Sequence, residues 1–204
     1  MIQTAITNTQ RPSYLDGLRV ASEAFEFVAE RHAGQFRDAD AAPFLLHPLE
    51  VGAVLFVFGY PEHVVAAGLL HDILESSNTS AVEVRVRFGP EIARLVEAVS
   101  ENPAVADPVE RKARLRRQVA AAGPEAAAVF AADKLSKVRE IRIRAACDAG
   151  FGSDEAVRRK LDHYAASRRM LEQQLGDHPV VQALAFELEA LQALPPQRSL
   201  FTGL

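Results

Sequence analysis

Residues 59–76 read GYPEHVVAAGLLHDILES, and this stretch shows the residue pattern that recurs along much of the chain. Glycine ends one helix, proline suits the first turn of the next, and glutamate suits the positive end of the helix dipole. The apolar residues that follow recur at the three- and four-residue spacing of a helix face. We therefore predict a buried helix over 62–76.

The same punctuation recurs as Gly89-Pro90-Glu91 and as Gly123-Pro124-Glu125, and Asp107-Pro108 and Ser153-Asp154-Glu155 are further helix starts. Alanine, leucine, glutamate and arginine dominate, and no segment shows sustained strand alternation. The sequence predicts an all-α fold, a single helical bundle of about eight to nine helices. The predicted helices cover 15–33, 48–58, 62–76, 80–87, 90–100, 108–121, 124–147, 154–175 and 179–193.

Length and composition are those of one soluble globular domain. The chain has 204 residues, of which 49% are apolar and 25% charged, and this length can bury one sizeable core. No apolar run reaches the roughly 18 residues that cross a bilayer, and the first residues lack the pattern of a secretory signal. We predict a flexible leader over 1–14, one domain over 15–193, a tail over 194–204 and a cytoplasmic location without a membrane partner.

Charge is distributed unevenly along the chain. The net charge of −4 argues against stable nucleic-acid binding. Between Pro108 and Arg144, however, ten Lys or Arg residues stand against four acids. This segment is either a set of solvated helix faces or a cationic wall for a highly anionic small substrate, and both readings stay open.

Four residues of metal-ligand type stand in three separate segments: His47 in HPLEV, His71 and Asp72 in GLLHDILE, and Asp133 in FAADKL. Two imidazoles and two carboxylates can hold one divalent transition metal and leave positions open for water and substrate, as metal-assisted hydrolysis requires. A hydrogen-bonded structural network is the alternative for such buried polar side chains. Because His47 precedes a proline, we expect it just before a helix.

Glu75 belongs to the same short stretch as two of these residues. It follows His71 by four positions and Asp72 by three, so all three side chains share one edge of a continuous helix. Crowding His, Asp and Glu on an otherwise apolar helix is costly unless each has a strong partner. A metal ion is one such partner.

Longer motifs surround these residues in a fixed order. They read RHAGQFR over 31–37, PFLLHPLEV over 43–51, AGLLHDILE over 67–75, FGPEI over 88–92 and ADKL over 132–135. Over about residues 20–175 the chain resembles the HD hydrolase domain of RelA/SpoT proteins and of the stand-alone small alarmone hydrolases.

The resemblance implies a helical HD domain with the activity of a guanosine polyphosphate 3′-pyrophosphohydrolase. This activity releases pyrophosphate from guanosine tetra- or pentaphosphate. The resemblance implies one manganese ion on His47, His71, Asp72 and Asp133, with iron, zinc and cobalt as alternatives. Glu75 is then the candidate general base or water-orienting acid.

The expected partner is a phosphorylated nucleotide, and assembly into a homo-oligomer stays open. Arg37 matches a basic residue that lies against the nucleotide in the family, and a planar guanidinium suits both a base face and a phosphate. Lys134 and Lys137 belong to the basic segment, and Lys137, four residues after Asp133, can reach a phosphate. Within 154–175, Tyr164 is the residue that we expect to point at the site.

The chain departs from the family's pattern at three positions. Ser76 stands where the family's HDxxED motif has its second acid, and Lys137 stands where the ADKLxN motif has asparagine. Asp38 stands where the family has a basic residue after the position of Arg37. A serine at the second catalytic position supplies no basic lone pair at neutral pH. Two alternatives therefore remain beside the hydrolase. One is a degenerate HD domain that binds metal and a nucleotide or a partner without efficient turnover, and the other is a helical interaction domain.

Overall fold

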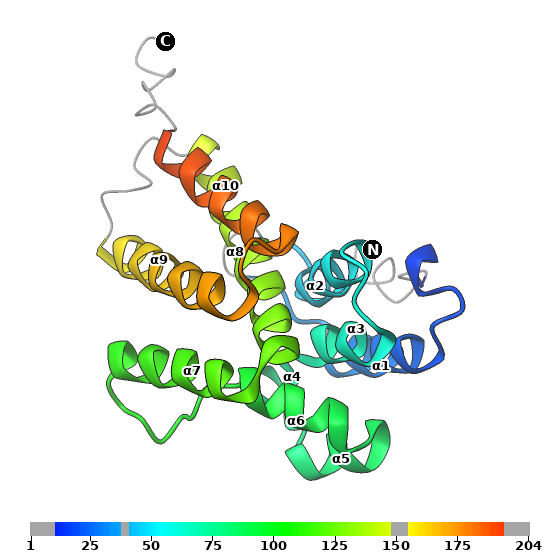
Figure 1. Ribbon diagram of the computed structural model, residues 1–204. Helices are drawn as coiled ribbons and strands as arrows, with labels where there is room; N and C mark the ends of the chain where they lie inside the picture. Colours follow the sequence, from blue (N-terminus) through cyan, green and yellow to red (C-terminus); the bar gives the residue numbers. More distant parts are fainter. Residues whose placement is uncertain (1–10, 38–40, 148–154, 194–204) are drawn as a thin grey trace.

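A computed structural model describes residues 11–37, 41–147 and 155–193, and Figure 1 shows the arrangement of its helices. Within these residues every regular element is helical apart from one isolated bridge between Phe36 and Pro43. None of the described helices is both long and apolar enough to cross a membrane. The elements are η1 (Ser13–Leu15), α1 (Arg19–Arg31), α2 (Leu46–Val57), α3 (Glu62–Leu70), α4 (Ile73–Ser76), α5 (Ala81–Phe88), α6 (Pro90–Val99), α7 (Pro108–Ala122), α8 (Pro124–Cys147), α9 (Glu155–Leu175) and α10 (Pro179–Ala193).

Helix starts follow the punctuation of the sequence. Gly89 and Gly123 have positive φ angles of 90° and 95°, which glycine adopts without steric cost, and α6 and α8 begin at the prolines that follow them. Asp107 caps α7 by accepting a hydrogen bond from the amide of Val109 at 3.0 Å. The prediction of an all-α fold is confirmed.

The predicted helix 15–33 is wrong at its start. The helix α1 begins only at Arg19, because Gly17 has a φ of 85° that no α-helix accommodates, and the short η1 turn precedes it. Tyr14 was assigned to the leader, but its hydroxyl donates to the carbonyl of Leu49 at 3.1 Å. Tyr14 therefore packs against α2 as part of the bundle.

The predicted helix 62–76 is interrupted at His71 and Asp72, where α3 ends and α4 follows. Asp72 has φ −93° and ψ −2°, and its carbonyl accepts the amides of Glu75 and Ser76 at 3.1 and 2.9 Å. Neighbouring residues of an uninterrupted helix point about 100° apart. The turn therefore lets His71 and Asp72 direct their side chains to one point.

The helix α8 runs through the middle of the bundle (Figure 1) and packs against α2, α3, α6, α7, α9 and α10. Residues 126–132 of this helix are at most 1% exposed. Five of the seven are alanines, whose small side chains let the surrounding helices approach closely. This packing places Asp133, the next residue along α8, in the buried centre of the molecule.

Gly68 marks the closest approach of α3 to α2. A Cβ at this position would overlap Leu55 Cδ1 and come within 3.3 Å of Val51 Cγ1. We expect Gly68→Ala to lower the free energy of unfolding by about 1–3 kcal/mol, because the added methyl group forces the two helices apart. Urea denaturation measures this change, and an unaltered unfolding midpoint would contradict the close approach.

Candidate metal centre and adjoining cavity

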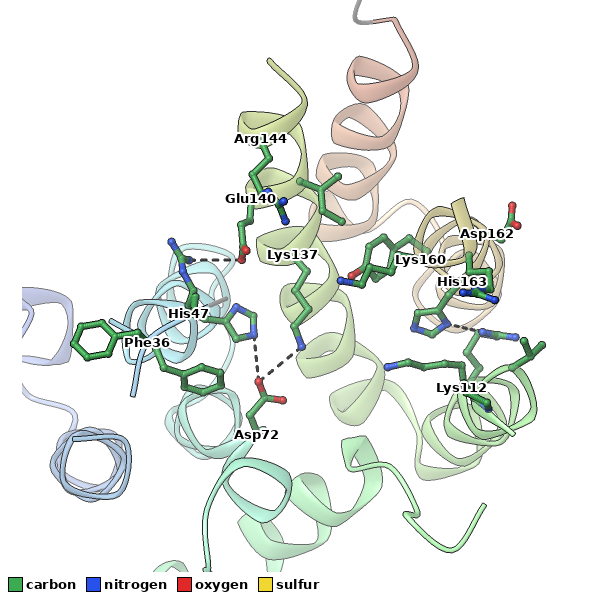
Figure 2. Close-up of a pocket in the computed structure, with 18 residues that line it drawn as sticks. Phe36, His47, Asp72, Lys112, Lys137, Glu140, Arg144, Lys160, Asp162 and His163 are labelled. Atoms are coloured by element: carbon green, nitrogen blue, oxygen red, sulfur yellow. Dashed lines mark hydrogen bonds and ion pairs between the residues drawn. The ribbon is translucent and has the colours of Figure 1, made fainter. Parts of the chain in front are cut away.

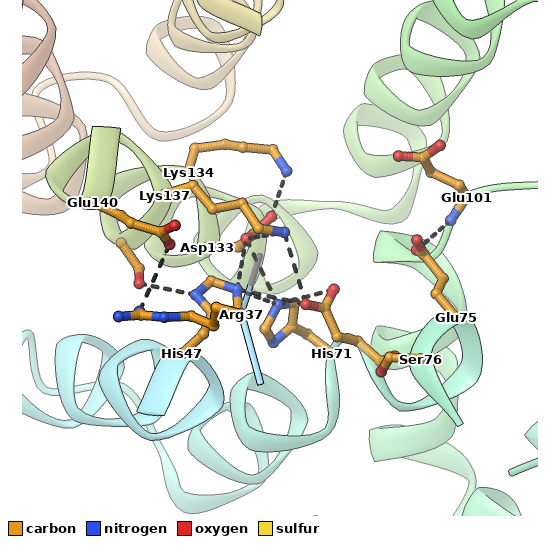
Figure 3. Close-up of polar contacts among 12 residues, drawn as sticks. Arg37, His47, His71, Glu75, Ser76, Glu101, Asp133, Lys134, Lys137 and Glu140 are labelled. Carbon is orange, nitrogen blue, oxygen red and sulfur yellow. Dashed lines mark hydrogen bonds and ion pairs between the residues drawn. The ribbon is translucent and has the colours of Figure 1, made fainter. Parts of the chain in front are cut away.

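The four predicted ligands meet at one point in the bundle (Figure 3). They come from the first turn of α2, the turn between α3 and α4, and the middle of α8. His47 Nε2 lies 3.1 Å from His71 Nε2 and 3.2 Å from Asp133 Oδ1. The carboxylate of Asp72 lies 3.5 Å from His47 Nε2 and 3.2 Å from His71 Nε2. The fold thus assembles residues that are up to 86 positions apart in the sequence.

His47 lies inside α2, not before it as predicted. The helix starts at Leu46, and the amides of Leu46 and His47 bond to the carbonyls of Pro43 and Phe44, both at 3.1 Å. Pro48 also falls in the first turn, where a backbone amide has no carbonyl of the same helix to reach. The missing amide hydrogen of Pro48 therefore costs nothing, and the helix extends past it to His47.

Hydrogen bonds on the far side of each imidazole fix its orientation. His71 Nδ1 lies 2.8 Å from the carbonyl of Gly68, so Nδ1 carries the hydrogen that it donates. His47 Nδ1 lies 2.9 Å from Ser136 Oγ, and that hydroxyl donates to Glu50 Oε2 at 2.8 Å. The serine hydroxyl can then only accept from His47, so each imidazole turns its Nε2 toward the site and presents a lone pair there when the ring is neutral.

The carboxylates of Asp72 and Asp133 require positive charge beside them. Asp133 Oδ1 is buried and accepts no hydrogen bond of good geometry. Burial disfavours the charged form of His71, but Asp72 and Asp133 outweigh burial and raise its pKa to about 9. Burial lowers the pKa of the neighbouring His47. Two imidazole nitrogens beside carboxylate oxygens are a donor set that fits a divalent transition metal.

Two lysines lie against the carboxylates of this site. Lys134 is buried, forms an ion pair with Asp133 Oδ2, and lies 4.3 Å from the ring centroid of Phe130. Lys137 Nζ lies 2.9 Å from Asp133 Oδ1 and 3.7 Å from Asp72 Oδ2. Lys137 lines the adjoining cavity but Lys134 does not, and the contact of Lys134 with substrate stays a prediction.

Glu75 does not join His71 and Asp72 as the continuous-helix prediction requires. Its carboxylate accepts a hydrogen bond from the amide of Glu101 at 2.8 Å and turns toward the loop after α6 (Figure 3). Burial raises the pKa of Glu75 despite that hydrogen bond. The hydroxyl of Ser76 donates to the carbonyl of Asp72. The catalytic roles of both residues stay predictions, and Asp38 lies outside the described residues.

A cavity of about 770 Å³ opens beside the four ligands (Figure 2). His47, Asp72 and Lys137 line one side of it, and the rings of Phe36 and Phe44 line it beside them. Its volume lies within the range of small-molecule and cofactor sites. The site of metal-ligand type is therefore open to a ligand of nucleotide size.

The opposite side of the cavity is cationic. Lys112 and Arg116 come from α7, and Arg159 and Lys160 come from α9. In Figure 2, Lys112 and Lys160 point across the cavity toward Lys137. These two α7 residues of the basic segment therefore face the cavity, and the anionic substrate stays a prediction. The contribution of α9 was not predicted, because its basic residues are indistinguishable in sequence from a solvated helix face.

Arg37 and Tyr164 line the cavity, as the sequence led us to expect. Arg37 Nη1 lies 3.7 Å from Glu140 Oε2, and burial raises the pKa of Tyr164 to about 12. His163 was missed, although it lines the same cavity. Arg116 lies 2.6 Å from its Nδ1, and burial together with nearby cations lowers the pKa of His163 to about 2. His163 is therefore a neutral imidazole, and no motif in the sequence distinguishes it.

Comparison with known families identifies the domain. The sequence model of the HD domain matches residues 24–166, which is more than half of the chain. The chain belongs to the HD domain family. In this HD domain, the matched region contains the four predicted ligand residues and all the residues that line the cavity.

Three similar proteins of known name are hydrolases of one kind. The HD domain is 32% identical over 120 residues to the guanosine-3′,5′-bis(diphosphate) 3′-pyrophosphohydrolase of Aquifex aeolicus. This match covers 58% of this chain but only 17% of the Aquifex protein. It is 36% identical over 122 residues to the mouse and human proteins named guanosine-3′,5′-bis(diphosphate) 3′-pyrophosphohydrolase MESH1. Those matches cover 58% of this chain and 68% of each relative.

Solved structures share the helical architecture. The Listeria monocytogenes protein lmo0812 superimposes with a TM-score of 0.66 at 27% identity, over 73% of this chain and 97% of that chain. A metazoan ortholog of SpoT, described as hydrolyzing ppGpp, gives a TM-score of 0.70 at 23% identity, over 92% of this chain and all of that chain. The second likeness supports the fold of the HD domain alone.

Ser136 offers a test of how the HD domain orients its ligands. We expect Ser136→Ala to weaken metal binding roughly 10- to 100-fold, because His47 Nδ1 loses the acceptor that fixes its tautomer. Ser22→Ala is the matched control, since its buried hydroxyl donates to the carbonyl of Leu15. Calorimetric titration with Mn²⁺ compares them, and equal affinities in both variants would contradict the role of Ser136.

Proposed function

We propose that this HD domain is a metal-dependent phosphohydrolase that removes the 3′-pyrophosphate of guanosine tetra- or pentaphosphate, or of a closely related nucleotide. One observation carries the proposal: two imidazole nitrogens and two carboxylates converge beside a cavity whose far side is cationic. The names of the relatives in Aquifex, mouse and human support the same reaction.

The proposed metal site consists of His47, His71, Asp72 and Asp133. Mixed imidazole and carboxylate ligands favour manganese, with iron, zinc and cobalt as alternatives. A divalent ion bound there supplies Lewis acidity to a phosphoryl oxygen and makes water a stronger nucleophile at neutral pH. The backbone and serine acceptors of the two Nδ1 atoms keep the imidazoles in the ligating tautomer.

The cationic side of the cavity is proposed to bind the remaining phosphates. Lys112, Arg116, Arg159 and Lys160 can pair with phosphate oxygens while the reacting phosphorus lies at the metal site. In hydrolysis the water oxygen bonds to the phosphorus as the bond from phosphorus to the 3′ oxygen breaks, and a proton from the water ends on the 3′ oxygen. Nearby cations stabilise the negative charge of the released pyrophosphate.

The nucleoside is proposed to lie on the aromatic and guanidinium groups of the cavity. Phe36 and Phe44 offer ring faces or edges to a base, and Arg37 offers a planar guanidinium. Tyr164, whose raised pKa keeps its hydroxyl protonated at neutral pH, can donate to a ribose or phosphate oxygen.

A second candidate function is a degenerate HD domain that binds metal and nucleotide without efficient turnover. The orientation of Glu75 and Ser76 favours it. The Glu75 carboxylate is bonded to a backbone amide, and the Ser76 hydroxyl is bonded to a backbone carbonyl. In this arrangement neither group is committed to orienting the water that attacks phosphorus.

A substrate screen with the Ser76→Asp variant decides between these functions. Manganese-loaded wild-type protein is expected to release pyrophosphate from guanosine tetra- or pentaphosphate, and monophosphates and cyclic nucleotides serve as comparison substrates. If wild type binds these nucleotides without turnover and Ser76→Asp gains hydrolysis, the degenerate function is correct. If neither protein hydrolyses any member of the panel, the proposed reaction is wrong.

A further inference from the structure

Lys137 holds a position that a metal at the proposed site would also need. Its ammonium lies 2.9 Å from Asp133 Oδ1 and 3.7 Å from Asp72 Oδ2 (Figure 3). The same two oxygens lie 3.2 and 3.5 Å from His47 Nε2. Lys137 and the imidazole of His47 therefore lie against the same two carboxylate oxygens.

A divalent ion and an ammonium group do not share these oxygens without cost. Two cations a few ångströms apart repel each other, and the repulsion is stronger in a partly buried site than in bulk water. Metal binding is thus opposed by Lys137 as long as its ammonium stays between the two carboxylates.

The ammonium group of Lys137 also has an alternative position, in the cavity. Its side chain remains 34% exposed and lines the cavity, on the side that faces Lys112 and Lys160 (Figure 2). A lysine side chain has four rotatable bonds, so its ammonium can leave the carboxylates without movement of α8. An anion bound in the cavity would give the displaced ammonium a new partner.

We propose that Lys137 is an internal counter-ion that competes with the metal for Asp133 and Asp72, and that transfers to a phosphate group of the ligand when the metal binds. This inference rests on the proposed function, because it needs the metal and the anion to occupy one site. Its consequence is coupling: an anion in the cavity raises the metal affinity, because it stabilises the ammonium in its displaced position.

Lys134 provides a matched comparison for this idea. It carries the same charge and pairs with the same residue, but it contacts Asp133 Oδ2 and lies over the Phe130 ring. Removing either lysine removes one positive charge near the metal site. Only the removal of Lys137 also clears the oxygen that faces the two imidazoles.

The experiment titrates Mn²⁺ into metal-free protein by calorimetry, with and without inorganic phosphate. Without phosphate, Lys137→Met is expected to bind Mn²⁺ about tenfold more tightly than wild type, and Lys134→Met is expected to gain clearly less. Phosphate is expected to strengthen Mn²⁺ binding more in wild type than in Lys137→Met. Lys137→Asn repeats the test with a polar side chain, and Lys112→Met replaces Lys134→Met if that variant does not fold.

Each other outcome has a distinct meaning. Equal gains in the Lys137 and control variants would reduce the effect to general charge repulsion and overturn the inference. Unchanged Mn²⁺ affinity in Lys137→Met, with one ion still bound by wild type, would overturn it and leave the proposed metal site intact. If wild type and all variants bound no Mn²⁺, the proposed metal site would fall and the inference with it.

Discussion

Replacing His71 with alanine is expected to reduce hydrolysis of guanosine tetraphosphate by roughly a thousandfold or more. The variant loses one of the two imidazoles of the proposed metal site and the hydrogen bond from Nδ1 to the carbonyl of Gly68 that orients this ring. Such a loss should exceed the roughly 10- to 100-fold effect of removing a hydrogen-bond partner of a ligand. The initial rate of pyrophosphate release in excess Mn²⁺ measures it.

His63→Ala is the matched control for this variant. His63 forms the only other group with metal-ligand geometry among the described residues, together with Glu91 and Glu125, and its Nε2 lies 2.8 Å from Glu125 Oε1. This group lies at the surface, outside the cavity lining, so the variant should hydrolyse like wild type. Loss of activity in His63→Ala, with activity retained in His71→Ala, would indicate that the reaction takes place at the surface group of His63 and would refute the site assignment.

Replacing Asp133 with alanine is expected to lower the free energy of unfolding of the metal-free protein by about 3–5 kcal/mol. The variant leaves the Lys134 ammonium 4% exposed and without its carboxylate. A buried charge without a partner is much less stable than a buried pair, and the Phe130 ring alone does not replace the lost carboxylate. Chemical denaturation followed by circular dichroism measures the change.

The double variant Asp133→Ala, Lys134→Met separates this electrostatic cost from a general loss of packing. Methionine keeps most of the apolar stem of lysine and removes the charge, so the double variant should recover a large part of the lost stability. Metal binding should stay lost in both. If the double variant were as unstable as Asp133→Ala alone, the stranded Lys134 charge would not be the cause.

Most of the fold could be predicted because residue types close in sequence indicate where the helices begin and end. Gly89 and Gly123 each precede a proline, and in each case one helix ends and the next begins there. The errors arose where backbone conformation is not visible in residue type. The positive φ of Gly17 prevents α1 from beginning before this residue. The turn at His71 interrupts a stretch whose apolar spacing is that of one continuous helix.

The candidate site was predictable to the level of its ligand residues but not of their surroundings. The motif order pointed to His47, His71, Asp72 and Asp133, and the fold brings all four together. The orientation of Glu75 could not be predicted, because the apolar spacing of 62–76 indicates an unbroken helix that would place Glu75 beside His71 and Asp72. Partners that depend on tertiary packing, such as Ser136 on the far side of His47, leave no sequence signal.

The cationic side of the cavity shows a second limit. Charge counting found the segment that contributes Lys112, but it could not separate a side chain that faces the cavity from one that faces solvent. The basic residues of α9 have the same local pattern whether they face Lys112 or water. Only the packing of α7 and α9 against α8 decides that Lys160 and His163 line the cavity.

The most direct measurement is product analysis of guanosine 3′,5′-bis(diphosphate) incubated with purified protein before and after metal chelation. The proposed function predicts GDP and pyrophosphate in equal amounts with Mn²⁺ present, loss of both products on chelation, and recovery when Mn²⁺ is returned. Hydrolysis that persists in the chelated protein, or full Mn²⁺ occupancy without either product, would contradict it.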